Sequence, residues 1–215
     1  MKLSSICACF FAALIAEISG HGYMFNPINR ASLWRLEPTN YTIPHDYEDN
    51  QFFCGGFSVQ YEINGGLCGP CGNDWRDPVP RSNENGGIYG SGTVVATYIT
   101  GSIIQTEAVI TANHMGSISY QLCELTDDSA PETEECFQAL PLIDGSYDQP
   151  IGKDDFNVTS YVQLPTEMVC SRCVLRWHYR AGNNWGLCEN GTSEVGCGDQ
   201  ETFRSCADIS ILPEF

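Results

Sequence analysis

Three observations predict that this chain folds as an all-β protein, an antiparallel β-sandwich with long, disulfide-pinned loops. From about Thr93 onward, short runs rich in Val, Ile, Thr and Tyr are separated by turn signals, and no helical periodicity is convincing. Apolar and polar side chains alternate with period two in several runs, for example over residues 174–179. Residues 21–92 are instead rich in Gly, Pro, Asn and Cys, which indicates loops. Strands separated by turns favour two packed antiparallel sheets.

The individual elements follow from the positions of these runs. The expected strands span residues 93–99, 102–111, 117–125, 158–164, 173–180 and 206–212. A short helix between residues 28 and 36 is compatible with the sequence but is not decided by it. The acidic segment from Asp127 to Glu135 contains a proline, and we interpret it as a solvated loop.

The first twenty residues have the layout of a secretory signal. One Lys precedes a largely apolar stretch from Ile6 to Ile18, which ends in Ser19 and Gly20 and is too short for a comfortable membrane span. Cleavage after Gly20 makes His21 the first residue of a single domain, residues 21–215; cleavage after Ala16 would leave Glu17 first. We therefore expect a secreted, extracellular protein with a removable signal peptide over residues 1–20.

Cysteine usage supports an exported protein. Two of the 12 cysteines, Cys7 and Cys9, lie in the leader, and the even number that remains predicts five disulfides of undetermined connectivity. The Cys-x-x-Cys pairs at 68/71 and 170/173 have a spacing that suits zinc, but an oxidising compartment favours disulfides. Sequons at Asn40, Asn157 and Asn190 are compatible with the same route.

Charge limits the partners. A formal net charge of −17 and a pI near 4.3 repel nucleic acid and anionic membrane surfaces, and are indifferent to a neutral glycan. The charge therefore predicts that the protein binds no nucleic acid. Because no second long apolar segment occurs, we also expect a soluble protein without a membrane anchor, and we expect a monomer.

Two of the four histidines occupy positions that suit a metal site. After signal removal His21 would offer a ring nitrogen and a free α-amine, and His114 follows the strand-like run 108–112. Two imidazoles and one amine suit Cu(II), which also brings one-electron oxygen chemistry. His178 lies amid alternating residues and is expected on a sheet face, and His45 lies in an acidic loop at the surface.

A second candidate group precedes the last strand. If extended backbone begins by Glu201, the side chains of Glu201 and Phe203 share one face, with Thr202 on the other. That face would combine a carboxylate with an apolar neighbour for a metal.

Several blocks in the same order resemble the lytic polysaccharide monooxygenases of auxiliary activity family fifteen, from His21 to about Ile211. They include His21-Gly22, Phe53-Cys54-Gly55-Gly56, Leu67-Cys68-Gly69-Pro70-Cys71-Gly72, Thr111-Ala112-Asn113-His114, Ala181-Gly182-Asn183-Asn184-Trp185-Gly186 and Gln200-Glu201-Thr202-Phe203-Arg204-Ser205-Cys206. The resemblance implies an immunoglobulin-like or fibronectin-like sandwich and one copper ion per chain, held by a histidine brace.

The resemblance also implies roles for particular residues. His21 and His114 resemble the two brace ligands, and Phe203 matches the axial position, which is Tyr in other members. Ala112 resembles the small residue that crowds the open copper face, and Glu201 matches an outer carboxylate or amide. Tyr23, two residues from the predicted metal, is a candidate sugar-stacking residue at the surface.

The implied activity is oxidative cleavage of insoluble chitin or cellulose, with oxidation at the anomeric carbon, an external electron donor, and oxygen or hydrogen peroxide. Two alternatives from other functional classes remain at this point. One is a non-catalytic carbohydrate-binding protein with an incidental metal, and the other is a copper-storage or copper-transfer protein.

Overall fold

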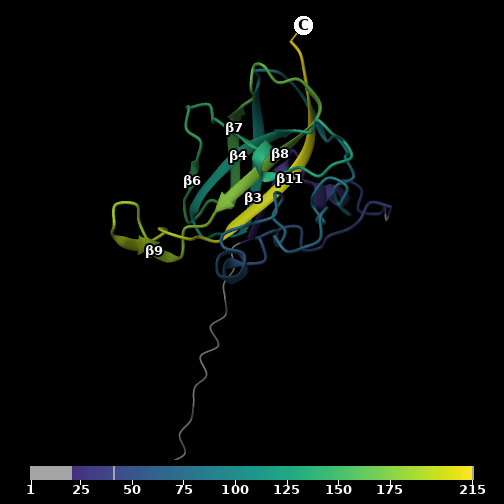
Figure 1. Cartoon of the computed structure of the whole chain (residues 1–215). Coiled ribbons are helices and arrows are strands. Elements are labelled where there is room, and N and C mark those ends of the chain that lie inside the picture. Colours follow the sequence, from purple (N-terminus) through teal and green to yellow (C-terminus); the bar gives the residue numbers. More distant parts are fainter. Residues whose placement is uncertain (1–20, 41, 215) are drawn as a thin grey trace, which may run out of the picture.

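The computed structural model describes residues 21–40 and 42–214, so the predicted signal peptide lies outside the described residues. Its strands form two sheets that pack face to face, with a small separate hairpin beside them (Figure 1). The prediction of a β-sandwich with disulfide-pinned loops is confirmed.

The smaller sheet has three antiparallel strands in the order β1-β3-β7. These are β1 (His21–Asn26), β3 (Ile103–Ala112) and β7 (Asn157–Gln163). Alternate residues of β3 and β7 are buried, which is the period-two pattern of a sheet with one face on a core. Because β1 pairs with the C-terminal half of β3, the first described residue lies at the edge of the folded domain rather than on a free tail.

The larger sheet has six strands in the order β2-β11-β8-β4-β5, with β6 also paired to β4. Their bounds are β2 (Ala96–Ile99), β4 (Gly116–Glu124), β5 (Gln138–Leu140), β6 (Gln149–Ile151), β8 (Cys170–Arg180) and β11 (Thr202–Leu212). One pair departs from the antiparallel prediction, since β2 runs parallel to β11. Parallel pairing needs a long connection between the two strands, and the chain between β2 and β11 supplies one.

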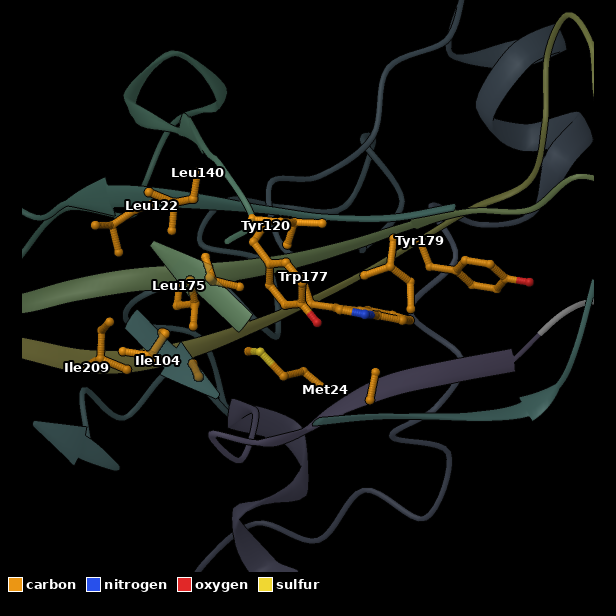
Figure 2. Close-up of a cluster of buried hydrophobic side chains, with 14 of the residues drawn as sticks. Met24, Ile104, Tyr120, Leu122, Leu140, Leu175, Trp177, Tyr179 and Ile209 are labelled. Atoms are coloured by element: carbon orange, nitrogen blue, oxygen red, sulfur yellow. The ribbon is translucent and has the colours of Figure 1, made fainter. Parts of the chain in front are cut away.

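The hydrophobic core fills the space between the two sheets. Trp177, Tyr120, Tyr179 and Phe203 are its largest members, and none of the four exposes surface. Figure 2 shows Tyr179 at one end of this cluster, beyond Trp177 and Met24. An aromatic set of this size contributes a large share of the apolar area that stabilises the fold.

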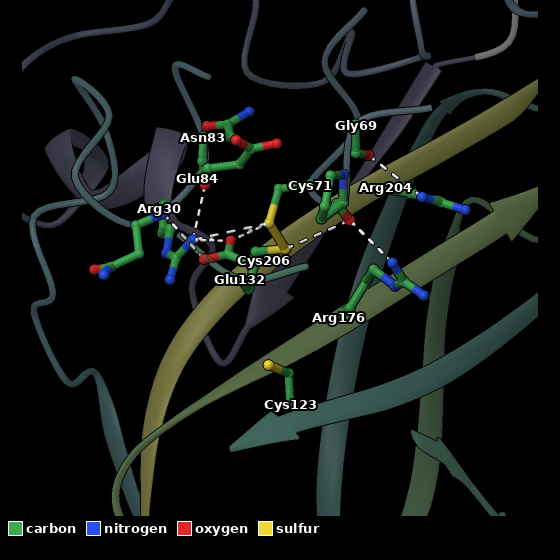
Figure 3. Close-up of a disulfide and its surroundings, with 12 residues drawn as sticks. Arg30, Gly69, Cys71, Asn83, Glu84, Cys123, Glu132, Arg176, Arg204 and Cys206 are labelled. Carbon is green, nitrogen blue, oxygen red and sulfur yellow. Dashed lines mark hydrogen bonds and ion pairs between the residues drawn. A yellow bond between two sulfur atoms is a disulfide. The ribbon is translucent and has the colours of Figure 1, made fainter. Parts of the chain in front are cut away.

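Loops cover the outer face of the larger sheet. Strands β8 and β11 are therefore buried on both faces over most of their length, which explains their nearly continuous apolar runs. Arg30 from the first loop bonds both carboxylate oxygens of Asp208 on β11 at 2.8 Å and also pairs with Glu132, with all three buried. Figure 3 shows Arg30 and Glu132 beside the Cys71–Cys206 disulfide.

Glu132 corrects one expectation. The segment 127–135 was expected to be a solvated loop, but Glu132 is 4% exposed because its carboxylate meets the buried Arg30 guanidinium. A buried charge of this kind requires a partner of opposite sign.

The prediction of five disulfides is confirmed. They join Cys54–Cys68, Cys71–Cys206, Cys123–Cys136, Cys170–Cys173 and Cys188–Cys197. The two Cys-x-x-Cys pairs differ, because 170/173 closes on itself whereas Cys68 and Cys71 bond to distant partners. Since all four sulfurs are in disulfides, none is a thiolate that could hold zinc.

The six predicted strands all exist, with ends that shift by a few residues. The undecided helix is a 3-10 helix, η1 (Arg30–Arg35), whose first turn is capped by the Asn29 side chain bonding the Ser32 backbone N–H. Two further short helical segments are a π-helix, η2 (Val59–Ile63), and a 3-10 helix, η3 (Glu134–Cys136). Over the described residues, no helix has the length and apolar character needed to cross a membrane.

The remaining hairpin projects from the sandwich. Strands β9 (Trp185–Leu187) and β10 (Ser193–Val195) pair with each other, and the Cys188–Cys197 disulfide joins the residue after β9 to the segment that follows β10. Figure 1 shows β9 well outside both sheets. Trp185, Leu187 and Val195 share one face of the hairpin and are each more than half exposed.

Candidate metal centre

The site begins at the first residue of β1. His21 is half-buried, and its Cα lies opposite that of Ala112 near the end of β3. The next residue has no room for a side chain, since a Cβ on Gly22 would come within 3.2 Å of Ile110, the Val109 carbonyl and Trp177. Glycine at this position lets β1 pass close over the core, which fixes where the His21 ring starts.

His114 lies two residues beyond Ala112, in the short connection between β3 and β4. Its backbone N–H donates to the Tyr179 hydroxyl at 3.1 Å, and its carbonyl accepts from the Gly182 N–H at 2.9 Å. The preceding Asn113 side chain donates to the carbonyls of Gly152 and Asp155 at 2.9 and 2.8 Å. His114 is thus held from both sides of its peptide unit.

The pairing of β1 with β3 brings the two histidines to the same edge of the smaller sheet. Burial, and then the nearby His21 ring, lower the pKa of His114. A lowered pKa keeps the His114 imidazole neutral near pH 7, which is the form that binds a metal. Two imidazoles at one sheet edge are a donor set that suits copper.

Phe203 forms the apolar floor beside His21. It is fully buried on β11, with its ring centroid 6.4 Å from that of His21, 5.6 Å from Tyr179 and 6.1 Å from Phe53. Because phenylalanine has no donor atom, this side of the site offers contact but no ligand.

Glu201 and Asn183 both approach one nitrogen of His114. Glu201 is 7% exposed, and its Oε2 lies 4.0 Å from His114 Nδ1. The Asn183 side-chain amide nitrogen lies 2.8 Å from the same Nδ1. The ring therefore turns its Nδ1 edge towards the protein, and Nε2 is the nitrogen left for a ligand.

Asn183 and Tyr179 are site residues that were not predicted from the sequence. Both lie inside blocks that carried the family resemblance or in a predicted strand, but their contacts with His114 span more than 60 residues of sequence. Spacing along the chain gives no signal for such a contact.

Tyr23 was expected at the surface, and this expectation was wrong. The residue is 9% exposed, and the Arg35 guanidinium lies 5.6 Å from the centre of its ring. Arg35 is itself fixed by two hydrogen bonds to Asp49, which explains how it can cover the ring.

The other two histidines lie elsewhere. His178 is on β8 inside the larger sheet, as expected, and its Nδ1 accepts from Arg204 at 3.3 Å. His45 is half-buried rather than free at the surface, and it stacks on Trp34 with ring centroids 4.9 Å apart.

One further cluster has the residue types of a metal site among the described residues. It consists of Cys71, Cys206 and Glu132, all buried. Its sulfurs are joined in a disulfide and its carboxylate is paired with Arg30, so its atoms are already engaged.

Comparisons with known proteins bear on this geometry. A family profile described as lytic polysaccharide mono-oxygenase, cellulose-degrading, matches residues 21–209. A solved lytic polysaccharide monooxygenase AA15 from Thermobia domestica, in the Cu(I) state, superposes with a TM-score of 0.84 at 42% sequence identity, covering 89% of this chain and 98% of that chain. A second solved structure, LPMO10B from Micromonospora aurantiaca, has a TM-score of 0.49 and 11% identity over 88% of this chain and 99% of its own. No protein in a search of curated sequences matches.

Proposed function

This chain belongs to the lytic polysaccharide monooxygenases, in auxiliary activity family fifteen, and on that premise we propose that it is a secreted enzyme acting on crystalline chitin or cellulose, with oxidation at the anomeric carbon. The observation that carries the proposal is the placement of His21 and His114 at one sheet edge, with Phe203 and Glu201 beside them.

Family membership decides between the functional classes considered for the sequence. The chain is a copper-dependent oxidoreductase that cleaves polysaccharides and draws electrons from an external donor. This replaces the two alternatives, a carbohydrate-binding protein without catalysis and a copper-storage or copper-transfer protein.

In the proposed centre one copper ion per chain is held by His21 and His114. Removal of residues 1–20 would expose the α-amine of His21, so that this residue offers two nitrogens, and His114 would add Nε2. When bound, copper supplies one-electron redox chemistry towards oxygen or hydrogen peroxide. The protein supplies two imidazoles, one on a paired strand and one on a loop fixed by hydrogen bonds, so their positions are restricted before the metal binds.

The neighbouring side chains shape the rest of the centre. Phe203 closes one side with an apolar ring, and Ala112, opposite His21, has a side chain too small to block the approach of a substrate. Glu201 places a carboxylate 4.0 Å from His114 Nδ1, where its charge favours a cationic metal on the same ring.

We expect the protein to contact the glycan surface through an exposed face rather than through a pocket. The β9–β10 hairpin begins at Trp185, two residues after Asn183, and Trp185 is 69% exposed. An exposed indole can stack on the apolar face of a sugar ring, so we assign substrate contact to Trp185 in place of the buried Tyr23. The acidic net charge is compatible with a neutral polymer.

The proposal includes a secretory signal over residues 1–20, a single catalytic domain over residues 21–215 and a monomeric enzyme. Five disulfides support a route through an oxidising compartment.

The first experiment tests the amino terminus. The protein is secreted from a eukaryotic host in two forms, the natural chain and a chain with one Ala inserted between Gly20 and His21. Mass spectrometry should show that the natural form starts at His21, and this form should bind Cu(II) much more tightly than the form with the extra Ala. A natural form starting at Glu17, or equal affinity of both forms, would contradict the proposed centre.

The second experiment tests the substrate. The copper-loaded natural protein is incubated with crystalline chitin and with cellulose in the presence of ascorbate, and soluble products are analysed by mass spectrometry. We expect oligosaccharides with aldonic acid ends from one or both polymers, and none from the His114→Ala variant. Tight copper binding without such products from either polymer would refute the proposed substrates while leaving the metal centre intact.

A further inference from the structure

The contact between Asn183 and His114 bears on how the second ligand is presented. We infer that Asn183 is a positioning residue, whose side-chain amide fixes the His114 ring and serves both of its neutral tautomers. The inference rests on the proposed copper centre and goes beyond it, because it assigns a role to a residue outside the ligand set.

The first step concerns the ring itself. An imidazole that binds a metal through one nitrogen carries its proton on the other, and the partner of that proton sets the ring's tautomer and orientation. In His114 the nitrogen that faces the protein is Nδ1, with Asn183 Nδ2 at 2.8 Å. Glu201 Oε2 is 4.0 Å from the same nitrogen, beyond hydrogen-bond distance. Asn183 is therefore the group placed to bond Nδ1.

The second step concerns the proton. With Nδ2 facing the ring, the amide N–H donates to an unprotonated Nδ1, and the ring proton is on Nε2. A metal at Nε2 takes the place of that proton, so Nδ1 must carry the hydrogen and needs an acceptor. Rotation of the terminal amide by half a turn exchanges Nδ2 for Oδ1, which accepts from Nδ1–H. An asparagine can thus form a hydrogen bond with Nδ1 of His114 both before and after metal binding.

The third step concerns how firmly the amide is held. The residue before Asn183 donates its backbone N–H to the His114 carbonyl at 2.9 Å. The residue after it, Asn184, is bonded through both its N–H and its carbonyl to the buried Gln200 side chain, each at 2.9 Å. The backbone on either side of Asn183 is fixed, so its side chain reaches the ring from a defined point at the base of the β9–β10 hairpin.

Two substitutions of similar size separate this role from simple packing. Asn183→Asp retains an acceptor for Nδ1–H but loses the donor, and Asn183→Leu loses both. A matched control, Asn184→Asp, adds the same charge one residue further along. The readouts are the Cu(II) dissociation constant from competition titration calorimetry and the electron paramagnetic resonance spectrum of the Cu(II) form, on chains starting at His21.

We expect Asn183→Leu to weaken Cu(II) binding by about tenfold, the lower end of the range for lost outer partners of metal-bound histidines. Its copper spectrum should change as well. Asn183→Asp should bind at least as tightly as the natural protein, and Asn184→Asp should match the natural protein within about twofold. Thermal unfolding of the metal-free variants verifies that each is folded.

The inference is overturned if Asn183→Asp loses as much affinity as Asn183→Leu, or if Asn183→Leu binds copper with natural affinity and an unchanged spectrum. These outcomes differ from failure of the proposed function, in which the natural protein itself would not bind Cu(II) tightly.

Discussion

The hydroxyl of Tyr179 accepts a hydrogen bond from the backbone N–H of His114 at 3.1 Å. Tyr179 is fully buried on β8, and its ring lies against Phe203, so the loop that carries one proposed ligand is tied to the floor of the site. Burial raises the pKa of Tyr179 to about 12, so its hydroxyl keeps its proton throughout the neutral range.

The first prediction concerns this bond. Tyr179→Phe leaves the His114 N–H without its acceptor, and we expect a loss of about 1 kcal/mol in the free energy of unfolding. Because the same loop carries His114, Cu(II) affinity should fall as well. Urea unfolding of the metal-free protein and titration calorimetry measure the two effects.

Tyr120→Phe provides the matched control. Its hydroxyl donates to Ser160 at 3.1 Å in the same core, away from the loop of His114. This variant should lose similar stability but bind copper normally. If Tyr120→Phe impaired copper binding as much as Tyr179→Phe, the effect would be one of general stability.

The second prediction tests Phe203 as the axial neighbour. Phe203→Tyr places a hydroxyl in an apolar, fully buried position, and an unsatisfied hydroxyl costs about 1–3 kcal/mol in the metal-free protein. If the hydroxyl meets the metal, bound copper should recover part of this cost. We therefore expect Cu(II) to raise the melting temperature of Phe203→Tyr more than that of the natural protein. An equal rise in both would show that the hydroxyl points away from the metal.

The long strands could be predicted because buried and exposed positions alternate along consecutive residues, as in β3 and β7, and this alternation is visible in the sequence. The sequence did not predict β5, β6, β9 or β10, which are three residues long and too short for a periodic signal. Strand β1 was not predicted either, because its three consecutive buried residues are followed by two exposed ones and show no period-two alternation.

In the metal centre, too, some residues could be predicted from the sequence and others could not. His21 and His114 could be predicted, because a terminal histidine and a histidine at a strand end are local features. Asn183 could not, since its position beside His114 depends on how the hairpin joins the larger sheet. The pairing of Cys68 and Cys71 was left open for the same reason, because each is bonded to a cysteine from a different segment of the chain.

The third prediction concerns the buried ion pairs that Arg30 makes with Asp208 and Glu132. Asp208→Asn removes one charge from the Arg30 pair, both members of which are nearly inaccessible to solvent. Loss of one partner of a buried pair costs about 3–5 kcal/mol, and we expect a loss of that order in urea unfolding. The exposed pair Arg76–Asp74 is the control, and Arg76→Gln should cost no more than about 1 kcal/mol. Similar losses for the two variants would mean that burial of the first pair does not determine its contribution.

The fourth prediction is a pH dependence. Burial, followed by the charges of Arg204, Arg176 and Arg180, holds the pKa of His178 well below 6.5. Between that folded-state pKa and 6.5 the unfolded chain binds the extra proton, so stability decreases as the pH falls below 6.5. The slope for one such group is at most about 1.4 kcal/mol per pH unit.

Glu134 titrates in a more acidic range. Burial raises the pKa of its carboxyl, but Arg176 and Arg204 outweigh burial and hold the pKa below 4.5. Its contribution is therefore complete above about pH 4.5 and is lost only as the pH falls through the folded-state pKa. Titration of Glu134 therefore does not change the stability in the pH range just below 6.5.

His178→Gln isolates the histidine, because an amide oxygen can still accept the hydrogen bond from Arg204 but cannot take up a proton. Urea unfolding of the metal-free natural protein should show stability falling between about pH 6.5 and pH 5.5, and the fall should be smaller in His178→Gln. The lowered pKa of His114 contributes in the same range in both proteins, so the difference between them reports His178 alone. If the two proteins lost stability in parallel, the His178 ring would have to take up its proton inside the folded sheet at an ordinary pH, despite the three arginines around it.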